Sequence, residues 1–266
     1  MANINIIAPP RYSIALTSAV ALAYEILLVR LFSISQWHHF AYMIISLALL
    51  GYGMSGAFLA LFRQALLDRF KSAFVLNLLL FASLLLSSYT LAQHTAFNSE
   101  EILWDPSQWL RLTVSYLLLS LPFFFIANAI GLALMHFHQQ VARVYGADLL
   151  GAGMGSLGIV ALLFLLFPES TLKLLAALGF ASAWLATAEL KVSSRALRWL
   201  PSVFMVFTLL LPTTWFTATL SPYKDLNQIL QIGGTRVIAR ESSPMGLITV
   251  VESTQVPLRH APGMSL

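Results

Sequence analysis

Residues 147–167 read ADLLGAGMGSLGIVALLFLLF, and this stretch distinguishes between two very different folds. Its first half places four glycines in eight positions after Asp148, a pattern typical of the glycine-rich loop that opens a nucleotide-binding Rossmann domain. Such a loop needs a strand before the glycines and an amphipathic helix after them. The residues that follow, IVALLFLLF, are apolar on every side and continue to the length of a membrane helix. The stretch therefore predicts a membrane helix whose Gly151 and Gly155, at GxxxG spacing, pack against another helix.

The whole chain has the composition of a membrane protein. Of its 266 residues, 58% are hydrophobic and only 10% are charged, whereas soluble domains carry roughly a quarter charged residues. The net charge of +4 comes from Lys and Arg residues scattered between apolar runs, which indicates membrane topology signals and no nucleic-acid partner. The chain has no cysteine, which excludes disulfides, thiolate metal sites and cysteine nucleophiles. The expected partner is the lipid bilayer.

Seven apolar stretches are long enough to cross a bilayer, which takes about 20 helical residues. They cover residues 12–32, 40–62, 72–93, 111–135, 147–167, 170–190 and 199–217. A tight turn at Pro168, Glu169 and Ser170 is expected to separate the fifth from the sixth. Pro201 and Pro212 bracket the seventh, which leaves a shorter or re-entrant segment open as an alternative. The expected fold is an all-α polytopic membrane bundle of about seven transmembrane helices, followed by a short β-hairpin tail.

The basic residues fall in alternate loops of this bundle. Arg63, Arg69 and Lys71 follow the second stretch, Arg143 follows the fourth, and Lys191, Arg195 and Arg198 follow the sixth. The loop at 94–108 carries Glu100, Glu101 and Asp105 and no Lys or Arg. The positive-inside rule therefore predicts a cytoplasmic N-terminus in a bacterial-type inner (plasma) membrane. Seven crossings would leave the tail outside, whereas an eighth crossing, or a seventh stretch that does not cross, would return it to the cytoplasm.

After residue 217 the chain becomes polar and is broken by Pro and Gly. Two strand-like runs, TRVIA (235–239) and LITVVE (247–252), are joined by RESSPMG (240–246), which contains the residues of a turn. We therefore divide the chain into a helical membrane domain, 1–217, and a tail, 218–266, that begins with a β-hairpin. Because a lone hairpin is marginally stable in water, we expect the tail to open a further domain.

Three ionisable residues within the apolar stretches are candidates for an intramembrane polar site. Glu25 and Arg30 lie in the first stretch, and Asp148 lies at the start of the fifth. An ionised side chain inside a bilayer costs on the order of 2.5–3.5 kcal/mol, so such residues usually have partners. Glu25 and Arg30 are five residues apart, about 140° around a helix, so they do not form an ideal intrahelical pair. Both roles stay open: an anchor between helices, with Arg30 reaching the interface, or a substrate or proton site.

The remaining motifs give no catalytic or metal centre. His38 and His39 are adjacent, and His136 and His138 are two residues apart, so neither pair has the spacing of helical metal ligands. A proton-linked role for them stays open. The run GYGMSGAF (51–58) places Gly51 and Gly53 in the second stretch, where small residues predict close helix packing.

Three segments together resemble the membrane-bound spermidine synthase-like (polyamine aminopropyltransferase-like) family. They are ALAYEILLVRLFSI (21–34), VYGADLLGAGMGSLG (144–158), and SPYKDLNQ (221–228) followed by ESSPMGLITVVES (241–253) and PLRHAPGMSL (257–266). The resemblance implies a multi-span N-terminal region joined to a Rossmann-like domain with a nucleotide-binding glycine loop and an acidic catalytic residue. It implies decarboxylated S-adenosylmethionine or S-adenosylmethionine as the cofactor of that domain. No residue here matches those positions, so we expect no catalytic, cofactor-binding or metal residue in this chain, which would be a piece of a longer protein.

The expected function is therefore that of a membrane anchor for a downstream spermidine synthase-like domain, to which it could also present a lipid-soluble substrate. Whether the intact protein is a transferase stays open. The alternative is a self-contained small-solute transporter or channel-like protein that uses Glu25 and Arg30. A third reading is an assembly or scaffold protein, such as a homo-oligomer, held together through the glycine-rich helices.

Overall fold

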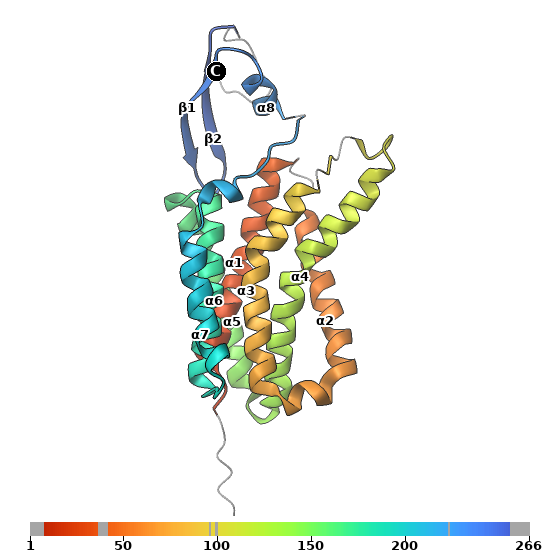
Figure 1. The fold of residues 1–266 in the computed structure, drawn as a ribbon, viewed down its shortest axis with the longest axis vertical. Coiled ribbons are helices and arrows are strands. Elements are labelled where there is room, and N and C mark those ends of the chain that lie inside the picture. The colour runs from red at the N-terminus through yellow and green to blue at the C-terminus, as the bar shows by residue number, and fades with distance from the viewer. Residues whose placement is uncertain (1–7, 37–41, 96, 99–100, 223, 256–266) are drawn as a thin grey trace, which may run out of the picture.

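A computed structural model describes residues 8–36, 42–95, 97–98, 101–222 and 224–255 of the chain. Within them, six helices are long and apolar enough to cross a membrane, which makes the chain a membrane-embedded, multi-pass helical protein by length and composition. They are α1 (Arg11–Ser35), α2 (Met43–Asp68), α3 (Phe70–His94), α4 (Ser107–His136), α5 (Val141–Leu165) and α6 (Pro168–Glu189), and they stand side by side in one upright bundle (Figure 1).

The seventh helix, α7 (Arg195–Leu210), is shorter than the sequence predicts. Its 16 residues rise about 24 Å, less than the roughly 30 Å of a bilayer core. The helix begins before Pro201 and ends two residues before Pro212, because a residue that precedes proline avoids the helical conformation; Leu211 is extended, with ψ 140°. Residues 213–216 form a separate 3₁₀ turn. Six helices within the described residues are thus long and apolar enough to span a membrane, and a seventh crossing stays a prediction.

The predicted turn at residues 168–170 is wrong. Pro168 is the first residue of α6, a position where its missing N–H costs no hydrogen bond, and Glu169 lies in the first turn of that helix. Only Leu166 and Phe167 connect α5 to α6. The correction matters because it turns Glu169 from a loop residue into a buried residue with a fixed position at the helix start.

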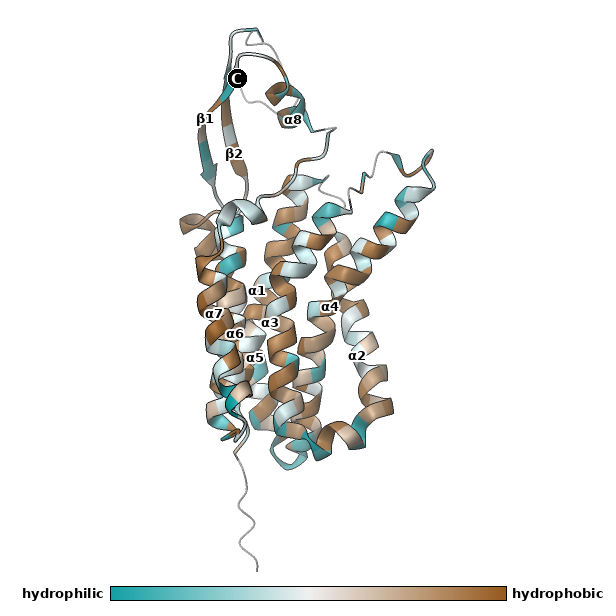
Figure 2. Cartoon of the chain, viewed as in Figure 1, coloured by the Kyte–Doolittle hydropathy of each residue, from teal (hydrophilic) through white to brown (hydrophobic). Residues whose placement is uncertain are grey.

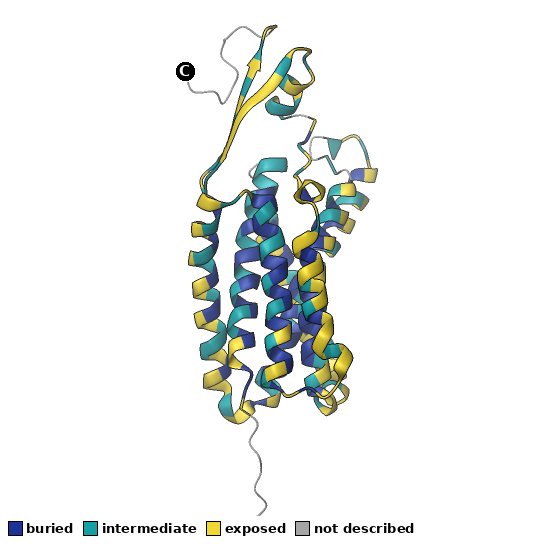
Figure 3. Cartoon of the chain, turned by 60° about the vertical axis from the view of Figure 1, so that its left-hand side comes forward, coloured by how far each residue is buried: buried dark blue, intermediate teal, exposed yellow. Residues whose placement is uncertain are grey.

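The outer helices of the bundle present apolar side chains outward, as a lipid environment requires. More than half of the apolar window is buried in α1, α3 and α6, but only 33% in α2 and 22% in α5. Figure 3 shows buried residues facing inward along the helices and exposed ones on the outer surfaces and the hairpin. Hydrophobic residues cover much of the outside of the helices in Figure 2, with more hydrophilic ones toward the ends. The exposed residues of α5 include Leu150, Met154, Leu157 and Phe164.

The tail forms the predicted two-stranded antiparallel hairpin. Strands β1 (Thr235–Ser242) and β2 (Leu247–Ser253) pair from Thr235 with Ser253 to Ser242 with Leu247, with a bulge between Val237 and Ala239. The strand β1 continues through three residues that the sequence assigned to the turn. A short helix, α8 (Asp225–Leu230), precedes the hairpin.

The hairpin and the basic loops lie at opposite ends of the bundle. The tail joins the bundle beside the C-terminal end of α1, where the Ser221 N–H donates to the Ser35 carbonyl at 3.0 Å. The C-terminal end of α6 lies beside the start of α1, because Glu189 accepts hydrogen bonds from the N–H groups of Tyr12 and Ser13 at 3.0 and 2.9 Å. Figure 1 shows the α2–α3, α4–α5 and α6–α7 connections at that second end, away from the hairpin.

Candidate functional site

Gly151 and Gly155 are contact points between α5 and α1. A Cβ atom on Gly151 would lie 2.7 Å from the Ala15 Cα, and one on Gly155 would lie 2.6 Å from the Ala19 Cα. The partners advance by four residues together, so α1 and α5 run parallel at this contact. Gly153 of the same stretch would meet no atom within 4 Å. The two helix backbones therefore touch through small residues one helical turn apart, which is how helices associate closely in lipid.

The two predicted packing glycines of α2, Gly51 and Gly53, lie in different surroundings. A Cβ on Gly51 would lie 2.6 Å from the Ser120 carbonyl oxygen and 2.7 Å from the Phe123 Cβ, so Gly51 packs tightly against α4. Gly53 would meet no atom within 4 Å, and its position is exposed. Gly53 therefore makes no close helix contact within the described chain, because its side of α2 faces away from α4, and its packing role stays a prediction.

Asp148 lies against α1 next to the glycine contact. Its Oδ1 accepts a hydrogen bond from the Ser18 hydroxyl at 2.5 Å. Ser18 is 3% exposed, so this bond satisfies a polar group that would otherwise be buried without a partner. The bond gives Asp148 an anchoring role at the start of α5.

Glu25 lies seven residues after Ser18, on the same face of α1 and about 10 Å further along the helix. Within the described part of the chain, its carboxylate takes part in no hydrogen bond or ion pair. The hydroxyl of Tyr52, on α2, lies within electrostatic range of both Glu25 and Asp148. We call Glu25, Asp148, Ser18 and Tyr52, contributed by α1, α2 and α5, the intramembrane polar group; among these described residues, only Ser18 and Asp148 are joined by a hydrogen bond. Tyr52 joins it without any signal in the sequence other than its position between two glycines.

Arg30 does not belong to the intramembrane polar group. Its Nη2 donates to the Ser243 carbonyl, in the turn of the hairpin, at 3.3 Å, while its Nε is buried with no partner among the described residues. It also borders a cleft of about 510 Å³ between the bundle and the tail, together with Lys224 and Arg240. Lys224 donates to the Ser33 carbonyl at 3.1 Å, and its partial burial lowers the pKa of its ammonium group. Arg30 therefore serves the contact between the bundle and the hairpin.

A second residue pair holds the hairpin on the bundle, and sequence reasoning missed it. The Arg240 Nη2 lies 2.8 Å from the Glu169 Oε1, and the Glu169 side chain is 6% exposed. The guanidinium also lies over the Phe167 ring, 5.4 Å from its centroid, in a cation–π contact. Since 71 residues separate the two partners, no spacing rule could have paired them.

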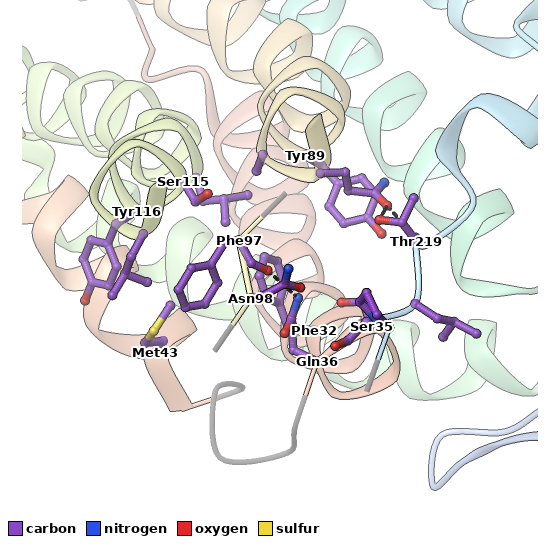
Figure 4. Close-up of a pocket in the computed structure, with 17 residues that line it drawn as sticks. Phe32, Ser35, Gln36, Met43, Tyr89, Phe97, Asn98, Ser115, Tyr116 and Thr219 are labelled. Carbon is purple, nitrogen blue, oxygen red and sulfur yellow. Dashed lines mark hydrogen bonds between the residues drawn. The ribbon is translucent and has the colours of Figure 1, made fainter. Parts of the chain in front are cut away.

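A cavity of about 300 Å³ lies at the same end of the bundle (Figure 4). It is bounded by the C-terminal ends of α1 and α3, the first half of α4 and residues 219–222. Four aromatic rings line it, those of Phe32, Tyr89, Phe97 and Tyr116, and no charged side chain is among its lining residues in the described chain. Two polar atoms there are buried without a partner among the described residues, the Tyr89 hydroxyl and the Gln36 Oε1. Tyr89 and Gln36 follow no motif, so the sequence carries no sign of this cavity.

Several predicted features lie outside the described residues. They are His38 and His39 and the whole of the segment PLRHAPGMSL (257–266). His136 is described, and its ring stacks on that of Phe70 with centroids 4.0 Å apart. Within the described ranges, no group of three His, Asp or Glu side chains is placed to hold a metal ion.

Comparisons with protein-family models, with curated proteins and with solved structures found no match to this chain. The resemblance to spermidine synthase-like proteins therefore stays a prediction, and the functional argument rests on the contacts described above.

Proposed function

We propose that this chain anchors an extramembrane unit in the inner (plasma) membrane and provides the platform on which that unit docks. The observation that carries the proposal is the ion pair between Arg240 of β1 and the buried Glu169 of α6. A carboxylate at 6% exposure is costly unless it is paired, so Glu169 of the bundle needs the guanidinium that Arg240 of the hairpin supplies. The Arg30 bond to Ser243 adds a second contact, to α1. Together these two contacts hold the hairpin in a defined position on the bundle.

The resemblance noted above supports a spermidine synthase-like domain as the unit that continues from this tail. In that case the transferase chemistry and the adenosyl cofactor belong to that domain. The anchor would contribute position, by holding the domain close to the membrane surface. No described residue of the anchor is assigned a catalytic role.

The orientation of the bundle bears on what the docked unit can do. The basic loops are at the end opposite the hairpin, and the positive-inside rule favours the cytoplasm for that basic end. We infer that the N-terminus is cytoplasmic and that the hairpin lies outside. This orientation requires α7, which is too short by itself for the bilayer core, to make a seventh crossing together with residues 211–217 that follow it. Adenosylated cofactors are expected in the cytoplasm, so this orientation favours a docked unit that does not depend on them.

Paired reporter fusions test this orientation. Alkaline phosphatase is active outside the cytoplasm and green fluorescent protein folds inside it, so each is fused after Leu266 and, as an internal control, in the α2–α3 connection at Arg69. We expect phosphatase activity from the first position and fluorescence from the second. Fluorescence from the fusion after Leu266 would overturn this orientation and would favour a docked transferase domain in the cytoplasm. Phosphatase activity at both positions would overturn the positive-inside assignment.

A second candidate, a transporter or channel-like protein, is favoured by the intramembrane polar group. The carboxylate of Glu25 has no hydrogen bond among the described residues and lies within electrostatic range of Tyr52, and such a residue is the kind that marks ion and proton paths. The structure separates Arg30 from that group, so a path would use Glu25 and Asp148. The two candidates predict different effects of Glu25→Gln on solute uptake.

A further inference from the structure

We propose that the cavity between α1, α3 and α4 binds a neutral amphiphile from the bilayer, with an uncharged hydroxyl-bearing head and a hydrocarbon chain. Its described lining residues include neither the charged residues that hold the hairpin, Arg30, Glu169 and Arg240, nor any residue of the intramembrane polar group. The proposal does not depend on the anchor function.

The lining of the cavity selects for an uncharged head. None of its described lining residues is charged. A phosphate, a carboxylate or a polyamine would therefore be desolvated there with no counter-ion, which is far more costly than burying a hydroxyl that finds a hydrogen bond. The basic residues Arg30, Lys224 and Arg240 line a different cleft.

The unpartnered polar atoms define the hydrogen bonds that the head has to make. The Gln36 amide donates through its Nε2 to the Phe97 carbonyl at 3.2 Å, which leaves Oε1 as an acceptor in need of a donor. The Tyr89 side chain is 2% exposed, and its hydroxyl can donate or accept. Hydroxyls on the ligand can serve both atoms, by donating to Gln36 and by accepting from Tyr89. Figure 4 shows both labelled side chains among those that line the pocket.

The position and size of the cavity fit an amphiphile. It lies where α1 and α3 end, at the boundary of the membrane-crossing segments, which is the depth at which the head of an amphiphile resides. Its volume of about 300 Å³ is at the lower end of small-molecule pockets, enough for a head and the first part of a chain. The rings of Phe32, Phe97 and Tyr116 supply apolar contact area for that chain.

Three probes with the same chain and different heads test the proposal: monoolein, which is neutral, oleate, which is anionic, and oleylamine, which is cationic. Each is titrated into the purified full chain in phospholipid nanodiscs, and binding is measured at equilibrium. We expect saturable binding of monoolein at least tenfold tighter than that of either charged probe. Equal binding of all three, or no saturable binding of monoolein, would overturn the proposal and leave Tyr89 and Gln36 bonded to water alone.

Variants locate the binding. Tyr89→Phe removes only the hydroxyl and should weaken monoolein binding roughly three- to tenfold. The matched control is Tyr24→Phe, because Tyr24 is also fully buried but its hydroxyl lies near Ser88, outside the cavity; we expect unchanged affinity. Ala92→Phe fills the cavity from α3 without removing a polar group and should abolish binding. Full monoolein affinity in both cavity variants would contradict the assignment, even if one of them accumulates poorly.

Discussion

Gly155 lies directly against the backbone of Ala19, so that a Cβ at position 155 would fall 2.6 Å from the Ala19 Cα. One turn earlier, Gly151 stands in the same relation to Ala15. No side chain larger than hydrogen fits at either position without moving α5 away from α1. This contact joins an outer helix to one whose apolar window is mostly buried, and nearby Asp148 is held to Ser18 by a hydrogen bond.

Gly155→Leu should destabilise the bundle by at least about 3 kcal/mol, because its side chain would collide with backbone atoms of α1 that cannot move aside. The matched control is Gly153→Leu, on the same helix, where a Cβ meets no atom within 4 Å. We expect the thermal unfolding temperature in detergent to fall for Gly155→Leu and to stay level or rise for Gly153→Leu. If Gly153→Leu instead breaks up an oligomer seen by size-exclusion chromatography, the scaffold reading gains support.

Removing either partner of the Glu169–Arg240 pair should release the hairpin from the bundle. Arg240→Gln leaves a buried carboxylate without its cation and should cost about 1–3 kcal/mol, with the double variant Glu169→Gln, Arg240→Gln recovering part of that loss. The measurement is the rate of proteolysis within the tail of the otherwise folded chain. Arg236→Gln is the control, because Arg236 pairs with Glu252 inside the hairpin at an exposed site. Equal proteolysis in Arg236→Gln and Arg240→Gln would remove the docking argument.

Glu25→Gln should raise the free energy of unfolding by on the order of 1 kcal/mol, because it removes an ionisable group that has no hydrogen bond within the described chain. Its accumulation in the membrane should therefore be unchanged or higher. Asp148→Leu should lower stability by about 1–3 kcal/mol, because Ser18 loses its acceptor. Unfolding in detergent measures both. A loss of solute uptake in Glu25→Gln at normal accumulation would favour the transporter over the anchor.

The start of α4 should loosen in acid. Hydrogen bonds from the Ser107 hydroxyl and N–H lower the pKa of Asp105, which holds the first turn of the helix. Because the folded pKa is below the unfolded value of roughly 3.9, the stabilisation is fully present above that value and is lost as the pH falls through the folded pKa. Amide exchange at Ser107 and Gln108, corrected for its intrinsic pH dependence, should therefore speed up near pH 3 relative to pH 6.

Asp105→Asn should remove most of this pH dependence and raise exchange at pH 6 toward the acid value. The control Asp68→Asn changes a carboxylate at the far end of α2, and it should leave exchange at Ser107 as it is in the unmodified chain. Exchange at Ser107 that is independent of pH in the unmodified chain would contradict the capping role.

Much of the fold was predictable because it depends on local properties. Hydropathy over about 20 residues predicted the helices α1 to α6, with ends that differ by at most six residues from those observed. Turn residues between two β-branched runs predicted the hairpin. The prediction was wrong in the extent of α7, which starts before Pro201 and ends before Pro212 as the shorter alternative expected, and at residues 168–170, where a turn was expected. Pro168 instead starts a helix, and Pro201 lies within one.

Helix spacing also predicted which residues could be special but not what they would face. Gly51 and Gly53 look alike in the sequence, yet only Gly51 meets another helix. Glu25 and Arg30 lie on one helix, yet the first lies within electrostatic range of Tyr52 and the second donates a hydrogen bond to the hairpin. The direction depends on how each helix is rotated against its neighbours, which short-range periodicity does not encode.

The sequence by itself determined that this is a helical membrane protein with a β-hairpin tail, because burial in lipid and turn formation are set by neighbouring residues. The tertiary structure decided the contacts that carry the functional proposals: Gly155 against Ala19, Glu169 with Arg240, and the cavity of Tyr89 and Gln36. These depend on the register between helices and strands that are tens of residues apart. That register follows from the packing of the whole bundle, in which each helix restricts the positions open to the next.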